Sequence, residues 1–220
     1  FLTNVIVGRS KVIHFCFKRI KHPMNATIVF NHPYEYSYCR ALLDAVCRGL
    51  SKACCTTDII YLDKEPFNPV MTASDLKTFK EHHPIDPKVI EYRERLQQAD
   101  HLIFIFPIWW ELMPALTKGF IDKVIFPGVA YEYTRNGYGM RPLFKKLKSI
   151  TIITTMNTPS LLYRLVFGNA IRKALITGTF WKMGYKNLKW LNFGMVKNVS
   201  NKRRKKWLIL LEQKFSKIRS

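Results

Sequence analysis

The sequence predicts an α/β protein with a doubly wound, five-stranded parallel sheet in the strand order 2-1-3-4-5. Short apolar runs alternate with stretches in which apolar residues recur at helical spacing, as in a sheet of this kind. The run at residues 101–106, HLIFIF, is apolar throughout, which is typical of a strand buried on both faces of a parallel sheet. With 220 residues, of which 48% are apolar, the chain can form one domain with a full core.

Five runs predict the strands of this sheet. The second run alternates only in part between apolar and polar residues, and the third ends at Pro107, which cannot continue a strand ladder. In chain order, the expected strands span residues 25–30, 57–62, 101–106, 149–155 and 188–193.

The segments between the runs predict the helices. Ser37 lies where the N-cap of the first helix belongs. Residues 128–139, GVAYEYTRNGYG, are rich in glycine and tyrosine and predict a loop mobile enough to close over a ligand. In chain order, helices are expected from Ser37 to about Leu50, at about 73–80, and at 88–98, 113–125, 161–176 and 200–218.

The net charge of +21 is concentrated at the two ends of the chain. Residues 1–24 hold five Lys or Arg and no acid, and residues 200–220 hold eight against one acid. We expect no specific nucleic-acid binding, because charged tails supply no platform of aromatic and basic residues. The basic run at 202–206 is typical of a solvated helix face, although weak contact of the tails with polyanions or anionic lipid stays open. Residues 1–23 are interpreted as an N-terminal basic extension and not a signal sequence, and residues 24–220 as the folded domain.

Composition also predicts the compartment. The five cysteines are odd in number and form no C-x-x-C, which argues against a disulfide framework or a structural zinc site, and no metal is expected. No apolar run approaches the roughly 18 residues that a membrane span needs. We therefore expect a cytoplasmic protein.

Two tryptophans directly after the third strand mark the candidate site. Ligands of parallel α/β sheets bind outside the carboxyl ends of the strands, which is where Trp109 and Trp110 are expected. Freed backbone amides after Pro107 and flat indole rings suit a planar heteroaromatic ligand. The alternative is that both tryptophans are core or dimer-interface aromatics, since aromatic side chains dominate ordinary packing.

The sequence pattern around these tryptophans resembles that of a known protein family. The pattern P-x-W-W-x-x-x-P-A-x-x-K-G-x-I-D-K-V, followed by P-G-x-A-Y, is similar to the signature of the flavodoxin-like NAD(P)H:quinone oxidoreductases, the modulator-of-drug-activity and diaphorase type. The resemblance covers about residues 24–212. It implies that the backbone of Pro107, Ile108, Trp109 and Trp110 lines a flavin ring. It also implies that Tyr131 and Tyr133 border the substrate pocket as the catalytic residues.

A strand, a loop and a helix N-terminus form a second candidate segment at residues 25–42. Such a geometry binds phosphate through unpaired amides and the positive end of the helix dipole, although an isolated serine is more often a plain cap. By resemblance, the loop HPYEYSYCRAL holds the flavin phosphate. His32, Ser37 and Tyr38 match the family pattern, and Cys39 stands where the family usually has asparagine, which leaves its backbone amide as the contact.

The segment after the fourth strand is the third candidate. By resemblance it contacts the flavin ring edge or ribityl chain through Thr154, Thr155 and Asn157, with Tyr163 nearby. Diaphorase relatives carry T-T-G-G and a nearby histidine here, whereas this chain has T-T-M-N and no histidine between Leu161 and Leu188. The resemblance therefore implies that a tyrosine or water, and not a histidine, supplies the proton.

These segments together predict a flavin-dependent enzyme that transfers two electrons from NAD(P)H to a quinone or similar acceptor by a ping-pong mechanism. The cofactor is FMN or FAD, with FMN favoured, and NAD(P)H is the co-substrate. The chain lacks a G-x-G-x-x-G, as expected if NAD(P)H docks on the flavin face. The resemblance implies a homodimer with the site at its interface. The alternative is a regulatory flavodoxin-like subunit of an ion-efflux system with little catalytic role.

Overall fold

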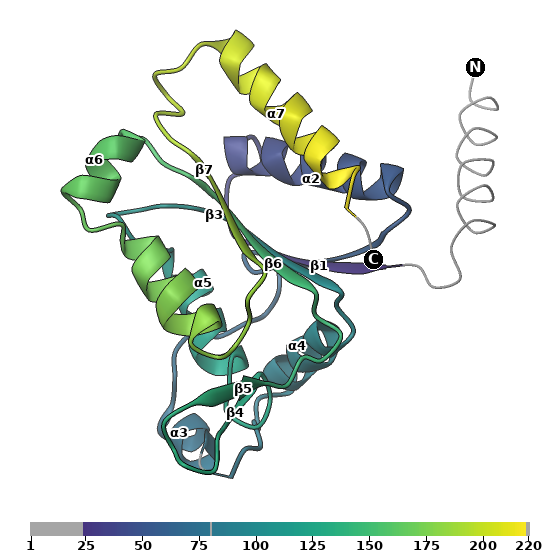
Figure 1. Cartoon of the computed structure of the whole chain (residues 1–220), viewed down its shortest axis with the longest axis vertical. Helices are drawn as coiled ribbons and strands as arrows, with labels where there is room; N and C mark the ends of the chain where they lie inside the picture. Colours follow the sequence, from purple (N-terminus) through teal and green to yellow (C-terminus); the bar gives the residue numbers. More distant parts are fainter. Residues whose placement is uncertain (1–23, 80, 219–220) are drawn as a thin grey trace.

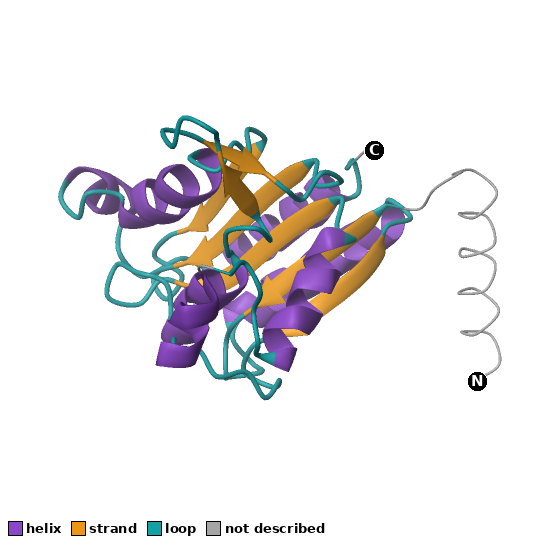
Figure 2. Cartoon of the chain, turned by 90° about the horizontal axis from the view of Figure 1, so that it is seen from below, coloured by secondary structure: helices purple, strands orange, loops and turns teal. Residues whose placement is uncertain are grey.

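A computed structural model of the protein describes residues 24–79 and 81–218. Five parallel strands form one sheet in the order β2-β1-β3-β6-β7. Figure 2 shows the sheet in orange, with helices packed against it. The predicted order 2-1-3-4-5 is therefore confirmed, and the predicted strand bounds are correct to within one residue. The strands are β1 (Asn25–Phe30), β2 (Thr56–Tyr61), β3 (His101–Pro107), β6 (Ser149–Thr155) and β7 (Leu188–Phe193).

Helices cover both faces of the sheet, and the sheet divides the core into two hydrophobic clusters (Figure 1). One face lies under α2 (Tyr38–Lys52) and α7 (Asn201–Phe215). The other lies under α4 (Pro87–Gln97), α5 (Ala115–Val124) and the π-helix η1 (Arg172–Trp181). The short helices α3 (Ala73–Phe79) and α6 (Ser160–Leu165) lie at the periphery. Within the described ranges, none of the helices is long and apolar enough to cross a membrane.

The presence of helices on both faces of the sheet explains the unbroken apolar run of β3. Ile103 and Ile105 pack into the core beneath α2 and α7, whereas Phe104 and Phe106 pack into the opposite core. Every residue of β3 is buried, because alternate side chains of a strand point to opposite faces and both faces are covered here.

A single serine caps the N-terminus of each of the two helices α2 and α7. The side chain of Ser37 accepts a hydrogen bond from the amide of Arg40 at 3.2 Å, which confirms the predicted N-cap of α2. Ser200 caps α7 in the same way through the amide of Arg203. The two helices then pack closely, because Gly49 of α2 has no side chain between it and the backbone of Glu212.

Two sequence-based expectations are wrong. The loop predicted at 128–139 contains most of an antiparallel hairpin, β4 (Tyr131–Tyr133) paired with β5 (Met140–Pro142). The signal was the dipeptide Asn136-Gly137, which is common in hairpin connections. Here it ends a turn in which the amide of Gly137 donates to the carbonyl of Thr134 at 2.8 Å, with Gly137 at a φ of 73°. The single helix predicted at 161–176 is instead α6 and η1, because the chain turns at Gly168 and Asn169, whose φ values are 69° and 55°.

Candidate functional site

Three loops meet at the carboxyl edge of the sheet, after β1, β3 and β6. These strands are parallel neighbours, so their carboxyl ends lie side by side. The backbone ties the loops together: the amide of Asn31 donates to the carbonyl of Ile105 at 3.0 Å, and the amide of Ile108 donates to that of Thr155 at 2.7 Å. The three predicted segments therefore form one region.

His32, in the first loop, reaches toward the second. Its ring lies edge-on to the ring of Trp109, with 6.1 Å between the centroids. Its Nδ1 accepts the amide of Tyr34 at 3.1 Å, so the neutral ring carries its proton on Nε2, which is then a hydrogen-bond donor. Burial lowers the pKa of His32, although the charge of Asp63 opposes the shift.

The N-terminus of α2 presents backbone donors at the same edge. Ser37 is the acceptor for the amides of Arg40 and Ala41. The amides of Tyr38 and Cys39 find no acceptor within the described part of the chain, and the first turn carries no acidic side chain. Free amides at the positive end of a helix dipole are a binding site for an anionic group.

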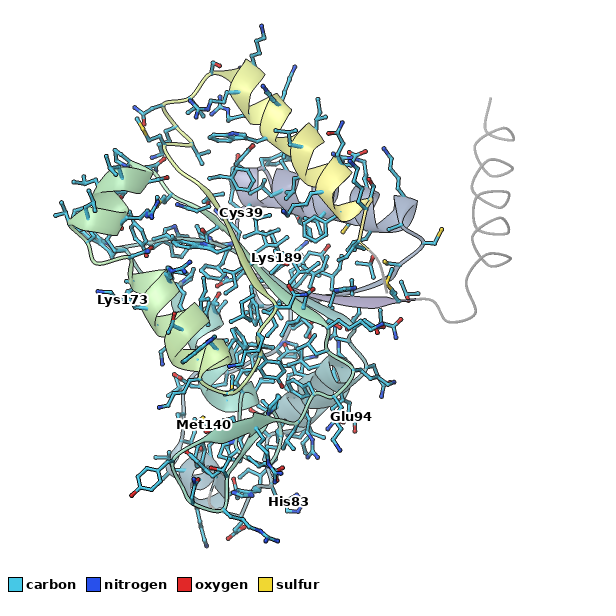
Figure 3. All side chains as sticks on the ribbon, in the orientation of Figure 1. Cys39, His83, Glu94, Met140, Lys173 and Lys189 are labelled. Carbon is cyan, nitrogen blue, oxygen red and sulfur yellow. The ribbon has the colours of Figure 1, made fainter. Side chains whose placement is uncertain are left out.

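The side chains of these two residues point elsewhere. The hydroxyl of Tyr38 donates to the carbonyl of Arg204 at 2.9 Å, and its ring packs on Trp207, beneath α7. Cys39, labelled in Figure 3, is 1% exposed, and its Sγ lies 3.2 Å from the hydroxyl of Thr155. Burial raises the pKa of Cys39 to about 12, so the thiol stays neutral. Both residues can therefore offer the site only their amides.

The tight turn after β3 exposes the two tryptophans. The backbones of Trp109 and Leu112 exchange two hydrogen bonds of 3.0 Å, and between them Trp110 and Glu111 have φ values of 48° and 63°. The side chain of Trp110 is 97% exposed and that of Trp109 is 46% exposed. Left-handed backbone at two bulky residues is strained, so other contacts must stabilise the turn.

Glu111 supplies those contacts. Its carbonyl accepts the hydroxyl of Tyr163 at 2.9 Å, and its Oε1 accepts the hydroxyl of Thr158 at 2.8 Å. The turn after β3 is thereby joined to the segment after β6. Sequence reasoning missed Glu111, because nothing but its place after the two tryptophans marks it.

The structure places the predicted residues of the third segment at different depths. Asn157 is exposed, and its side-chain oxygen accepts the amide of Lys197. The hydroxyl of Thr154 is fully buried between Trp190 and Asn192, at 2.9 Å from each partner. Tyr163 is also fully buried, and its hydroxyl accepts the amide of Ile171 at 3.0 Å. Thr154 and Tyr163 therefore lie beneath the edge and support it.

Tyr131 and Tyr133 lie outside this region. Their rings are 5.6 Å apart on the hairpin, where they line a separate cavity of about 510 Å³ together with Phe79, Ile121 and Met183. In Figure 3 the hairpin, marked by Met140, is at the lower end of the molecule. Burial, with a contribution from the neighbouring Tyr133, raises the pKa of Tyr131, which therefore keeps its proton. Among the described residues of one chain, no ring contact joins these tyrosines to the tryptophans.

Comparison with known proteins agrees with this architecture. Residues 24–213 match a family model described as a flavodoxin-like fold, so the chain belongs to the flavodoxin-like family. An uncharacterised NAD(P)H oxidoreductase of Haemophilus influenzae is 28% identical over 193 residues, which are 87% of this chain and 94% of the relative.

Two further likenesses are informative. The crystal structure of Smu.1420 from Streptococcus mutans matches with a TM-score of 0.77 and 32% identity, over 89% of this chain and all of that one. An FMN-dependent NADH:quinone oxidoreductase of Coprothermobacter proteolyticus is 30% identical over 98 residues. That match covers 44% of this chain and 45% of the relative, less than half of either.

Proposed function

We propose that the protein is a flavin-dependent oxidoreductase that transfers two electrons from NAD(P)H to a quinone or a similar acceptor. One observation carries the proposal: the free amides of the α2 N-terminus and the exposed tryptophan turn meet at one edge of the sheet. The first suits a phosphate and the second suits a flat ring. The names of the relatives, an NAD(P)H oxidoreductase and an NADH:quinone oxidoreductase, support the same reaction class.

The residues at this edge fit a flavin mononucleotide. Ser37 and the amides of Tyr38 and Cys39 would hold the phosphate, and Nε2 of His32 would donate to it. The backbone from Pro107 to Trp110 would line the ring. FMN is favoured over FAD because one helix N-terminus suits one phosphate group, and because the Coprothermobacter relative is FMN-dependent.

Once bound, the flavin would supply the redox chemistry, and the protein would supply orientation and a dry site. NAD(P)H and then the acceptor would stack in turn on the face of the bound flavin, next to the flat apolar rings of Trp109 and Trp110, which is the basis for a ping-pong order. Asn157, exposed at the same edge, can contact the ring. A tyrosine hydroxyl or water delivers the proton, because His32 is neutral and lies on the phosphate side.

We further propose that the enzyme is a homodimer with the site at its interface. Apolar side chains of the α6 segment stay exposed beside the tryptophan turn: Leu161, Leu165 and Val166 are 68%, 75% and 66% exposed. A patch of this kind is typical of an interaction surface. A second copy could cover it and bring its own Tyr131 and Tyr133 to the tryptophans, which one chain does not do.

The test is an absorption spectrum of the purified protein, followed by addition of NADPH under argon and then of menadione. A yellow protein that bleaches with NADPH and recovers with the quinone is expected, and mass analysis of the released cofactor distinguishes FMN from FAD. A protein that stays colourless and inert after incubation with either flavin would overturn the proposal.

Two variants locate the site. Ser37→Asp places a negative charge against the phosphate and should abolish flavin loading. Trp110→Ala should weaken flavin retention or turnover about tenfold or more, whereas Leu210→Ala, which removes an apolar side chain 50% exposed on α7, should change neither. Normal loading and turnover in both site variants would place the flavin elsewhere.

A further inference from the structure

A second cavity, of about 370 Å³, lies at the opposite, amino-terminal edge of the sheet. It is lined by the first residues of β3 and β6, by the start of β7 and by the C-terminal end of α7. Seven residues of β3 separate it from the tryptophan turn, which is a distance of about 20 Å along the strand. The residues that matter most are His101, Ser149, Thr151, Lys189, Lys214 and Lys217.

The lining is polar where the fold would otherwise place apolar side chains. On this face of the sheet, Ile103 and Ile153 pack into the core beneath α2 and α7. At the amino ends of the same two strands, buried His101 and Ser149 are paired neighbours, and buried Thr151 pairs with Lys189 of β7. Burial of polar groups is unfavourable unless they find partners, so this cluster points to a bound polar ligand.

One ring nitrogen of His101 lacks a hydrogen-bond partner among the described residues. Its side chain is 3% exposed, and its Nδ1 lies 2.7 Å from the hydroxyl of Ser149. Its Nε2 is buried and has no hydrogen-bond partner within the residues that the structure describes. If Ser149 donates to Nδ1, then Nε2 carries the proton, and an acceptor in the cavity would complete the ring's hydrogen bonds.

The charge at the mouth of the cavity is positive. Lys189, Lys214 and Lys217 take part in no ion pair with other described residues. Lys148, which also lines the cavity, pairs with Asp100 at 3.2 Å, and the other oxygen of that carboxylate accepts the amide of Asn25 at 2.9 Å. Asp100 is thus already engaged, and three ammonium groups remain available, as suits an anion.

We propose that this cavity binds a small molecule that carries a phosphate group. Nε2–H of His101 and the hydroxyl of Thr151 would contact the ligand at the floor, and the ammonium groups of Lys189 and Lys217 would bind the phosphate at the mouth. The cavity volume is within the range of small-ligand sites, about 300–1,000 Å³. Because the site lies at the far edge of the sheet, its occupancy does not depend on the proposed flavin chemistry.

The test is calorimetric titration of the full chain with pyrophosphate, with the ionic strength held constant by NaCl. The double variant Lys189→Ala/Lys217→Ala should bind pyrophosphate about tenfold more weakly or worse. The matched control Lys145→Ala/Lys146→Ala removes two exposed charges outside the cavity and should change the affinity less than twofold. The variant Ser37→Asp places a negative charge at the α2 N-terminus and so removes anion binding there. It should keep the binding event that the Lys189→Ala/Lys217→Ala variant weakens, which separates this cavity from the α2 N-terminus.

An NMR titration of the histidine rings tests the floor of the cavity. Pyrophosphate should shift the His101 imidazole resonances saturably in the wild type and not in the Lys189→Ala/Lys217→Ala variant. Equal weakening by the two double variants would show that bulk charge alone attracts the anion, and an unmoved His101 would show that the anion binds elsewhere. Either result would overturn the proposal.

Discussion

The hydroxyl of Tyr163 holds the tryptophan turn from beneath, because it bonds both the carbonyl of Glu111 and the amide of Ile171. Tyr163→Phe leaves both groups without this partner in a buried place, so we expect a loss of about 1–3 kcal/mol in the free energy of unfolding, measured with urea. The control Tyr138→Phe removes a hydroxyl from a side chain that is 96% exposed and should cost less than about 0.5 kcal/mol. Equal stabilities would show that Tyr163 is not a support.

His32 gives the site a pH dependence at the residue scale. Burial holds the pKa of its ring below the ordinary value of 6.5 in the free protein. A bound phosphate would raise that pKa, so binding takes up a proton. The affinity therefore increases as the pH falls from the pKa of the bound state to the lower pKa of the free protein. Flavin fluorescence titrations between about pH 5.5 and 8 should show this gain in the wild type but not in His32→Gln. Parallel pH profiles for the two proteins would contradict the role of His32.

At the scale of elements, the packing of α2 against α7 decides the effect of a glycine substitution. Helix propensity alone predicts that Gly49→Ala stabilises α2 by about 1 kcal/mol. A Cβ at Gly49 would lie 2.6 Å from the carbonyl oxygen of Glu212 and 2.7 Å from Cβ of Phe215. We therefore expect a destabilisation of about 1–3 kcal/mol in urea, and little change for the control Ser51→Ala on the exposed face of α2. A stabilised Gly49→Ala would show that the helices are less tightly packed.

At the scale of the whole molecule, the separation of the hairpin tyrosines from the tryptophans predicts complementation between copies of the chain. Trp110→Ala and Tyr133→Ala should each be poorly active, since each lacks one wall of both sites in the proposed homodimer. Unfolding and refolding the two variants as an equal mixture should recover about a quarter of the wild-type activity, because half of the dimers then hold one intact site. Activity that stays at the level of the separate variants would contradict a shared site.

The features of the fold that could be predicted from the sequence are those that local residue patterns specify. The apolar run at 101–106 and the cap at Ser37 act through their nearest neighbours in the chain, so the strand and the helix start followed from them. The strand order followed from the alternation of strands and helices along the chain. The turn at Gly168 and Asn169 was not predicted, because a left-handed backbone at Asn169 depends on contacts such as that of its amide with the carbonyl of Tyr163. The helix propensities of single residues contain no information about such a contact.

The sequence by itself determined the doubly wound sheet and the loops that gather at its carboxyl edge, because parallel strands in a known order place those loops side by side. Only the tertiary structure decided the depth and direction of each side chain. In the structure, the side chains of Tyr38 and Cys39 point away from the site and Tyr163 is buried beneath it. Tyr131 lies outside the site, on the hairpin. The tertiary structure also left His101 with an unpaired nitrogen at the far edge. The physical reason is that burial and hydrogen-bond partners come from residues distant in the chain, which no local pattern specifies.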